Sequence, residues 1–285
     1  MTFKYPNLGH YLAGLIEGDG SIKVNLLSKK GKEIYPNITI SFASKDLPLA
    51  KKLANLIQGT LNKGSGNWYV LSVYKESALY DLVTLINGKF RTPKIEALHR
   101  LIIWLNNTNK FNQLEFLPLD NSPLKSNGWL AGFSDSDGSF LIQFSILLGI
   151  AKNIKLTFRI SHRQLYHNTS LNFTSYLPIL SSIAICFKSI LSSYSRTKST
   201  TIKVEHGYLM IINKKSSRLE LIDYFNLFPL LTSKHLEFLA WKEADILTRN
   251  REYRSLEGTS KLVALKKSMN SKRTQFDWSH LDLYL

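Results

Sequence analysis

A nine-residue segment near the start of the chain recurs 118 residues later. Leu12-Ala-Gly-Leu-Ile-Glu-Gly-Asp-Gly20 matches Leu130-Ala-Gly-Phe-Ser-Asp-Ser-Asp-Gly138, and six of fourteen positions agree when 11–24 is aligned with 129–142. Each copy is a short apolar run with small residues inside it, ending in an acid and a glycine. Self-similarity at a fixed spacing indicates a fold built from repeated units. We therefore expect two equivalent halves that bring their acids together.

The composition limits the kinds of protein that this chain can be. Its 285 residues are 44% hydrophobic and 20% charged, enough to bury a sizeable core. The net charge of +16 favours a polyanionic partner, above all nucleic acid, although a generally basic surface is the alternative reading. The single cysteine, Cys186, excludes an internal disulfide and a paired-cysteine zinc site. No apolar run approaches the ~18 residues of a membrane span.

Hydrophobic periodicity predicts the same order of elements in both halves. In the first half it predicts helices at 9–17, 47–57, 77–86 and 94–105, and strands at 21–28, 34–42 and 68–74. In the second half it predicts strands at 139–145, 155–161 and 208–213, and helices within 171–187 and at 219–225 and 234–247. A basic helix is predicted at 256–268, outside the repeat. The chain thus divides into a first repeat, a linker rich in Asn, Pro and Leu, a second repeat and a helical extension, at 1–110, 111–127, 128–248 and 249–285.

The small residues of the two motifs predict a close contact between two helices. Ala13, Gly14, Ala131 and Gly132 leave little side chain on one face of each helix. If these faces pack together, the aspartates at the helix ends lie side by side. That arrangement is unfavourable, because a helix C-terminus is already partly negative and neighbouring carboxylates repel each other. A divalent cation between the acids would relieve both problems, whereas the alternative is that the acids merely form turns after a helix.

The paired motifs, each opening a unit of one helix and two strands, resemble those of the LAGLIDADG homing endonucleases in their single-chain, two-motif form. The resemblance covers roughly residues 8–248. It implies an α+β fold of two pseudo-symmetric αββαββα repeats, whose two four-stranded sheets form a saddle over double-stranded DNA. It further implies a monomeric, metal-dependent endonuclease that makes a staggered double-strand cut in a long asymmetric target. Such enzymes are encoded in organellar group I introns, which points to a fungal mitochondrion.

The resemblance also implies the roles of individual residues. Asp19 and Asp137 are the expected catalytic groups and metal ligands, and the carbonyls of Gly18 and Ser136 are further candidate ligands. Magnesium is the expected cofactor, for which calcium or manganese can substitute. One metal helps to generate hydroxide and another stabilises the leaving oxygen. Glu17 and Asp135 cannot share the helix face of the aspartates, so we interpret them as supporting groups.

A second repeated feature is a lysine just before a long apolar helix. Lys94 follows Thr92-Pro93, and Lys234 follows Thr232-Ser233. A lysine in the first turn faces the positive end of the helix dipole, which is unfavourable. Its recurrence at matching positions therefore suggests function. The resemblance implies a basic residue near the scissile phosphate in each half, whereas the alternative is a solvated surface lysine.

The strands would contact DNA through the polar residues that alternate with their apolar ones. A two-stranded β-ribbon fits the major groove, where such side chains bond base edges and phosphates. Any one-sided sheet shows the same alternation, so the sheet is predicted more firmly than each contact. In the first half the predicted contacts are Ser21, Lys23, Asn25, Lys30, Lys32, Tyr35, Asn37, Thr39, Ser41 and Trp68. In the second half they are Gln143, Ser145, Lys155, Thr157, Arg159, Ser161 and Lys203.

Two rival functions remain open at this stage. One is an RNA maturase that assists splicing of a group I intron on the same fold. The other is a non-catalytic DNA-binding protein. The intact pair of Asp19 and Asp137 favours the nuclease, and no membrane or obligate protein partner is expected.

Overall fold

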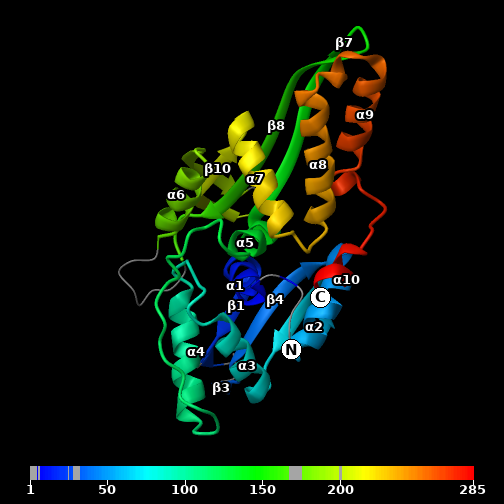
Figure 1. Ribbon diagram of the computed structural model, residues 1–285. Helices are drawn as coiled ribbons and strands as arrows, with labels where there is room; N and C mark the ends of the chain where they lie inside the picture. Colours follow the sequence, from blue (N-terminus) through cyan, green and yellow to red (C-terminus); the bar gives the residue numbers. More distant parts are fainter. Residues whose placement is uncertain (1–4, 6, 25, 28–32, 167–174, 199–200) are drawn as a thin grey trace.

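The protein is an elongated molecule of two lobes joined at a central pair of helices (Figure 1). The computed structural model describes the chain except for residues 1–4, 6, 25, 28–32, 167–174 and 199–200. The central helices are α1 (Leu8–Asp19) and α5 (Trp129–Asp137), which open the two halves of the chain. Each lobe consists of one four-stranded antiparallel sheet with helices on one face.

The helices and strands follow in the same order in both halves. After α1 come β1 (Gly20–Lys23), β4 (Asn37–Ala43), α2 (Leu47–Leu56), β5 (Thr60–Lys63), β6 (Trp68–Val73), α3 (Glu76–Ile86) and α4 (Ile95–Asn107). After α5 come β7 (Gly138–Leu147), β8 (Ile150–Arg163), α6 (Leu177–Cys186), β9 (Ile190–Lys198), β10 (Thr201–Ile212), α7 (Lys215–Leu227) and α8 (Lys234–Arg249). The strand orders are β1-β4-β6-β5 and β7-β8-β10-β9, and the first half adds a small pair, β2 (Leu26–Leu27) with β3 (Glu33–Ile34).

The predicted pair of αββαββα repeats is confirmed, with a further closing helix in each half. The predicted strand at 34–42 is divided, since β3 ends at Ile34 and β4 begins at Asn37. Pro36 stands in this gap, where a residue without an N–H cannot continue the ladder. The sequence analysis missed β5 and β9, whose outer-edge positions demand little apolar alternation.

Strand register aligns the two halves residue by residue. Gly20 pairs with Ile40 across β1 and β4, and Gly138 pairs with Ile160 across β7 and β8. Because the two glycines end the two motifs, Ile160 is the equivalent of Ile40. Two residues further along, His162 is the equivalent of Phe42.

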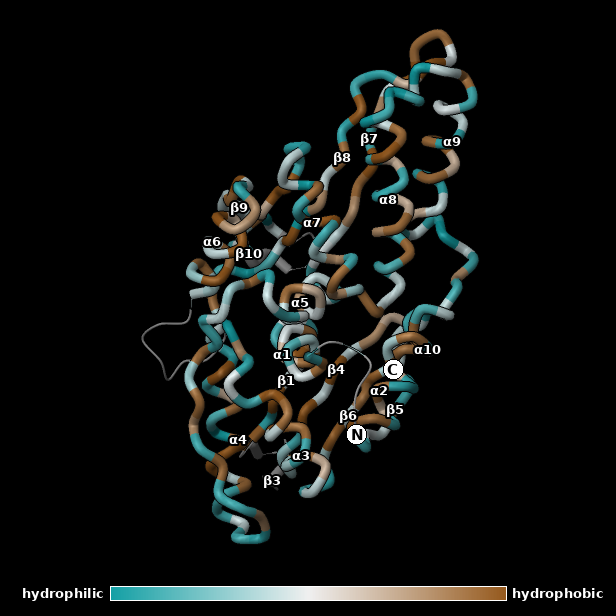
Figure 2. The backbone as a smooth tube through the Cα atoms, in the orientation of Figure 1, coloured by the Kyte–Doolittle hydropathy of each residue, from teal (hydrophilic) through white to brown (hydrophobic). Residues whose placement is uncertain are grey.

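Apolar side chains fill the space between each sheet and its helices. Ile22, Ile38 and Ile40 point inward from the first sheet and are almost fully buried. In the second lobe the rings of Phe140, Phe158 and other aromatic residues pack at centroid distances of 5.0 to 6.0 Å. The turn after α4, at the lower end of Figure 2, is hydrophilic, whereas the tip of the β7–β8 hairpin is apolar and exposed. Among the described residues, no helix combines the length and apolarity needed to cross a bilayer.

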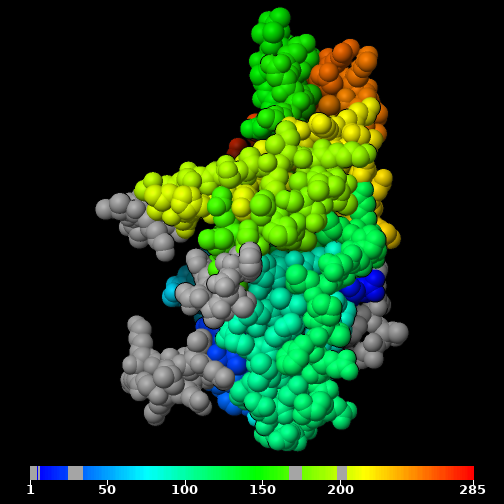
Figure 3. Space-filling model, turned by 90° about the vertical axis from the view of Figure 1, so that its left-hand side faces the viewer, coloured from blue at the N-terminus to red at the C-terminus, as the bar shows by residue number. Residues whose placement is uncertain are grey.

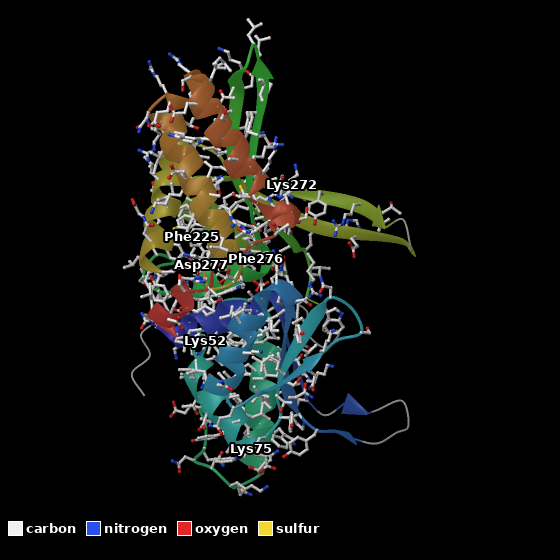
Figure 4. All side chains as sticks on the ribbon, turned by 90° about the vertical axis from the view of Figure 1, so that its right-hand side faces the viewer. Lys52, Lys75, Phe225, Lys272, Phe276 and Asp277 are labelled. Atoms are coloured by element: carbon white, nitrogen blue, oxygen red, sulfur yellow. The ribbon has the colours of Figure 1, made fainter. Side chains whose placement is uncertain are left out.

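The C-terminal extension runs from the second lobe back to the first (Figure 1). The predicted basic helix is α9 (Leu256–Lys267), which packs on α8 and on the β7–β8 hairpin. The chain then descends to α10 (His280–Tyr284), a short helix that the sequence analysis missed. Asp282 of α10 lies 2.9 Å from the ammonium of Lys52 in α2, close to the labelled Lys52 of Figure 4. The extension therefore contacts both lobes.

Candidate active site and nucleic-acid interface

The backbones of α1 and α5 touch at two glycines. A Cβ on Gly14 would lie 2.0 Å from the carbonyl oxygen of Trp129, and a Cβ on Gly132 would lie 2.0 Å from that of Tyr11. The two contacts are equivalent, because each partner is 118 residues from its counterpart. Only glycine permits so close an approach of two backbones. The small-residue faces therefore meet at the axis between the halves, as predicted.

This contact brings the two aspartates together at the helix ends. A Cβ on Gly18 would lie 2.2 Å from Cβ of Ser136 and 3.4 Å from Oδ2 of Asp137. Asp19 follows Gly18, so the carboxylates of Asp19 and Asp137 are neighbours. Partial desolvation and the charge of Asp137 raise the pKa of Asp19 to about 6, against the lowering effect of two nearby lysines. Asp19 is exposed and Asp137 is partly buried, so neither carboxylate is fully shielded from solvent.

Glu17 and Asp135 are fully buried and connect the halves. Glu17 accepts hydrogen bonds from the backbone N–H groups of Arg91 and Thr92 and from Nε1 of Trp129, across the axis. Asp135 likewise accepts from the backbone of Leu231 and Thr232, from the Thr232 hydroxyl, and from the Tyr11 hydroxyl across the axis. Burial raises the pKa of Glu17 to about 7 and raises that of Asp135. Both residues are structural groups, as interpreted from the sequence.

Lys94 and Lys234 lie beside the aspartates, and each ammonium caps one of the central helices. Lys94 Nζ donates to the carbonyls of Ile16, Glu17 and Gly20 at 2.7 to 2.9 Å. Lys234 Nζ donates to the carbonyls of Ser134 and Ser136 at 3.2 and 2.6 Å. Burial lowers the pKa of Lys94 to about 8 and lowers that of Lys234.

These contacts explain why each half has a lysine at the start of a helix, where its charge is unfavourable for that helix. Each lysine begins its own helix but reaches the negative end of another helix, where a cation is favourable. The alternative of a solvated surface lysine is wrong for Lys94, which is 4% exposed.

The donor atoms at this centre suit a hard divalent cation. The two carboxylates supply oxygen, and within the described part of the chain no cluster of three or more His, Cys, Asp or Glu residues could hold a metal. The Ser136 carbonyl, a predicted ligand, already accepts from Lys234, although a carbonyl has a second lone pair. A cation here would therefore need further oxygen ligands, which phosphate and water provide.

The outer face of the first sheet carries the predicted polar residues. Strand pairing places Ser21, Thr39, Ser72 and Thr60 in one row across all four strands. A broad depression of about 1080 Å³ covers this face, and the predicted contacts Lys23, Tyr35, Asn37 and Thr39 line it. Ser41 and Trp68 are also exposed. The Tyr35 hydroxyl donates to Glu76 at 2.5 Å, which holds the ring at the edge of the depression.

The second sheet presents most of its predicted residues in the same way. Gln143, Ser145, Lys155, Arg159 and Ser161 are exposed. Arg159 Nε donates to the Ser139 hydroxyl at 3.0 Å, and the hydroxyls of Ser161 and Tyr194 lie 2.9 Å apart.

Thr157 is a correction, because its side chain is only 5% exposed. Strand pairing places Thr157 opposite Leu141, and neighbouring residues cover it although its position in the strand faces outward. Asn25, Lys30 and Lys32 lie outside the described residues, and the structure describes the strand but not the side chain at Lys203.

Some surface residues of both sheets escaped the sequence analysis. Most of them lie on strands that were not predicted or at strand ends, and Ser72 lies within a predicted strand. The strand pairing is the signal that reveals them. The β9–β10 arm projects from the body of the molecule in Figure 3, and in Figure 4 it points to the same side as the β2–β3 hairpin. The residues concerned are Asn62, Ser72, Arg163, Tyr194 and Arg196.

Arg163 is a residue of this set whose charge acts on the active centre. Its guanidinium is exposed, and its charge is close enough to help lower the pKa of Lys94. His162, beside it, is buried and places Nδ1 2.8 Å from Oδ2 of Asp137. Nothing in the sequence pattern singled out this histidine.

Comparisons with known proteins agree with this architecture. The family model of LAGLIDADG endonucleases matches residues 12–105 and 130–244. The intron-encoded DNA endonuclease aI3 of Saccharomyces cerevisiae is 36% identical over 99% of this chain and 74% of its own. An uncharacterized cox1 intron-2 protein of Schizosaccharomyces pombe is 29% identical over 89% of this chain and 70% of its own.

Solved structures share the fold. The meganuclease I-SmaMI bound to uncleavable DNA superposes with a TM-score of 0.69 at 18% identity, over 93% of this chain and 99% of its own. A second structure of I-SmaMI, bound to an uncleaved DNA target in the presence of calcium ions, gives a TM-score of 0.62 at 16% identity, over 92% and 98% of the two chains.

Proposed function

Because the chain belongs to the LAGLIDADG endonuclease family, we propose that it is a homing endonuclease that cuts both strands of a long, asymmetric DNA site. The observation that carries this proposal is the paired Asp19 and Asp137 at the ends of two helices in backbone contact. One acid would be an ordinary turn residue. Two neighbouring acids, on a basic molecule with two exposed polar sheets, form a centre for hydrolysing phosphodiesters.

The two sheets form the DNA-binding face in this proposal. In Figure 4 the strands of both sheets lie toward the same side of the molecule and the helices lie toward the other, and polar residues of these strands are exposed. Phosphate contacts by lysine and arginine would set the register of the protein on DNA, and hydroxyl and amide groups would read bases in the major groove. Every predicted residue named above remains a proposed contact except Thr157.

A divalent cation, which we propose to be magnesium, fits between the two carboxylates. Asp19 and Asp137 would hold it, and the Gly18 and Ser136 carbonyls are additional oxygen donors. When bound, the cation lowers the pKa of water and stabilises charge on the leaving oxygen. Desolvation and, after it, repulsion from Asp137 raise the pKa of Asp19, and a bound cation would relieve that repulsion.

The protein groups around the centre have separate tasks. Glu17 and Asp135 fix the two helices and the loops that carry the lysines. Lys94 and Lys234 hold the helix ends that present the aspartates, and their ammonium groups lie near the charge that develops on the phosphate. Both lysines therefore serve structure and electrostatics at once.

We also propose the organisation and origin that the family suggests. The chain acts as a monomer, divided at 1–110, 111–127, 128–248 and 249–285. It is encoded by an intron of a fungal mitochondrial gene and works in that organelle, in line with its relatives from yeast introns.

The test is cleavage of a plasmid that carries the candidate intron-insertion site, with purified protein and magnesium. The wild type should cut both strands, and Asp19→Asn or Asp137→Asn should lower the rate on the order of a thousand-fold by removing several kcal/mol of charge stabilisation. DNA affinity measured by gel shift in calcium should stay within a few-fold in both variants. A protein that binds the site without cutting would instead be a regulator, and one that promotes intron splicing in both variants would be a maturase.

A further inference from the structure

The two halves differ at one buried position beside the paired aspartates. His162 is the equivalent of Phe42, and the two side chains are 7% and 4% exposed. His162 Nδ1 lies 2.8 Å from Oδ2 of Asp137. Phenylalanine offers no such donor to Asp19, whose carboxylate makes no hydrogen bond or ion pair with the described residues. One aspartate is therefore held by a side-chain hydrogen bond and the other is not.

The ring of His162 is itself fixed by its neighbours. Its centroid lies 4.1 Å from that of Tyr176, with the ring planes at 71°, and 5.5 Å from that of Phe133. An ionised carboxylate can only accept hydrogen bonds, so Nδ1 must carry the proton that points at Asp137. Nε2 is buried and has no hydrogen-bond partner among the described residues. Turning the ring over by half a turn would break the bond to Asp137, because a carbon would then stand where Nδ1 lies.

The surroundings of the two aspartates also differ. Leu47-Pro48 and Leu177-Pro178 open equivalent helices, so Tyr176 stands where the first half has Asp46. The Asp46 carboxylate turns away to accept from the backbone N–H of Ser233 at 2.6 Å. Asp19, Phe42 and Asp46 line a depression of about 200 Å³. Asp19 thus faces open space, whereas Asp137 faces packed rings.

We propose that His162 is a positioning residue that holds Oδ2 of Asp137 and directs the other oxygen, Oδ1, toward the cation. This inference rests on the proposed nuclease function. A carboxylate ligand that loses such a supporting hydrogen bond typically loses about 10- to 100-fold in metal affinity or activity. Since Asp19 has no equivalent support, the two DNA strands depend unequally on His162.

The first test measures the two strands separately. A target duplex with a different label on each strand is cut under single-turnover conditions by the wild type and by His162→Phe, which imports the residue of the first half. We expect His162→Phe to slow the cut of one strand about 10- to 100-fold while the other strand changes less than about 3-fold. Phe225→Leu is the control, because it removes part of a buried ring from the same lobe without touching Asp137. If His162→Phe slows both strands equally, as a general loss of structure would, the inference is wrong.

The second test needs no turnover. Calcium is titrated calorimetrically into the complex of each protein with its DNA target. His162→Phe should weaken the calcium affinity by about 10- to 100-fold, whereas Phe225→Leu should leave it within about 3-fold. Unchanged calcium affinity in His162→Phe would overturn the positioning role.

Two polar replacements keep the inference testable if His162→Phe does not fold. Asparagine places its amide nitrogen where Nδ1 lies, whereas glutamine places it further out, near Nε2. His162→Asn should therefore restore both the strand rates and the calcium affinity, and His162→Gln should not. Equal behaviour of these two variants would contradict the proposal.

Failure of this inference can be told from failure of the proposed function. If the wild type cuts neither strand of its target, the nuclease assignment fails. If the wild type cuts both strands and His162→Phe matches it on each, the nuclease assignment stands and only the role of His162 is lost.

Discussion

At the scale of single residues, the active centre contains charged groups whose burial is unfavourable by itself. The ammonium of Lys94 is buried but satisfied by three carbonyls, and the carboxylate of Glu17 is buried but satisfied by three donor residues. A buried charge is tolerated only when its hydrogen bonds are complete. Replacing either group should therefore affect stability as well as activity.

Lys94→Met tests the stability part of this argument. The change leaves the carbonyls of Ile16, Glu17 and Gly20 without their donor at a buried helix end. We expect the free energy of unfolding to fall by about 3 kcal/mol, measured by urea denaturation. Lys63→Met is the control, since Lys63 is exposed at the end of β5 and should change stability by less than about 0.5 kcal/mol. A Lys94→Met variant as stable as this control would show that the carbonyls do not need the ammonium.

Glu17 predicts how stability depends on pH. Folding raises the pKa of this carboxyl from 4.5 to about 7, so the folded state binds its proton more tightly. The contribution to stability is fully present below pH 4.5 and is lost as the pH rises through 7, by about 3 kcal/mol. We therefore expect the unfolding free energy of the wild type to fall relative to that of Glu17→Gln as the pH is raised from 4.5 to 7.5. Parallel curves for the two proteins would contradict this expectation.

At the scale of elements, the contact between α1 and α5 decides whether the two halves join. Gly14→Ala and Gly132→Ala should be equally damaging, because each new Cβ meets a carbonyl oxygen at 2.0 Å. We expect each to cost about 3 kcal/mol or more in unfolding free energy, through forced separation of the helices. Gly66→Ala, in an exposed turn, is the control, because its new Cβ would meet only the exposed ring of Trp68, at 3.1 Å, which has room to shift, so we expect a small change. Thermal unfolding of the three variants measures the difference.

The sequence could predict those elements whose signals are local. Apolar alternation located β1, β4 and β7, and the repeated motif located α1, α5 and the aspartates that end them. The edge strands β5 and β9 escaped because their residues are exposed on most sides and show no apolar period. Lys94 and Lys234 were found only by their repetition, since the carbonyls that they contact are more than 70 residues away. His162 gave no signal, because the equivalence of positions 162 and 42 becomes visible only when the strand pairing is known.

At the scale of the whole molecule, the positive charge predicts the salt dependence of DNA binding. Among the residues whose side chains are described, seven exposed basic residues lie on the sheet strands: Lys23, Lys63, Lys152, Lys155, Arg159, Arg163 and Arg196. If each neutralises one phosphate, the logarithm of the association constant should fall with that of salt concentration with a slope of about −6. Fluorescence anisotropy in EDTA measures this slope across a potassium chloride series.

The slope also distinguishes the two faces of the protein. Lys155→Ala should reduce its magnitude by about 0.9, whereas Lys267→Ala should leave it unchanged. Lys267 is exposed on α9, which packs on the helical side of the second sheet. Equal effects of the two changes would mean that DNA does not lie on the sheets.

The unlike surfaces of the two sheets give the molecule a direction along DNA. In the first sheet the row from Ser21 to Thr60 carries hydroxyl groups throughout, whereas the matching row of the second sheet passes from Ser139 and Arg159 to Ile211 and Ile190. A palindrome built from either half of the target would offer one lobe the wrong partner. The protein should therefore sit on its site in one orientation only, so that turning the site around in a chromosome turns the bound enzyme with it.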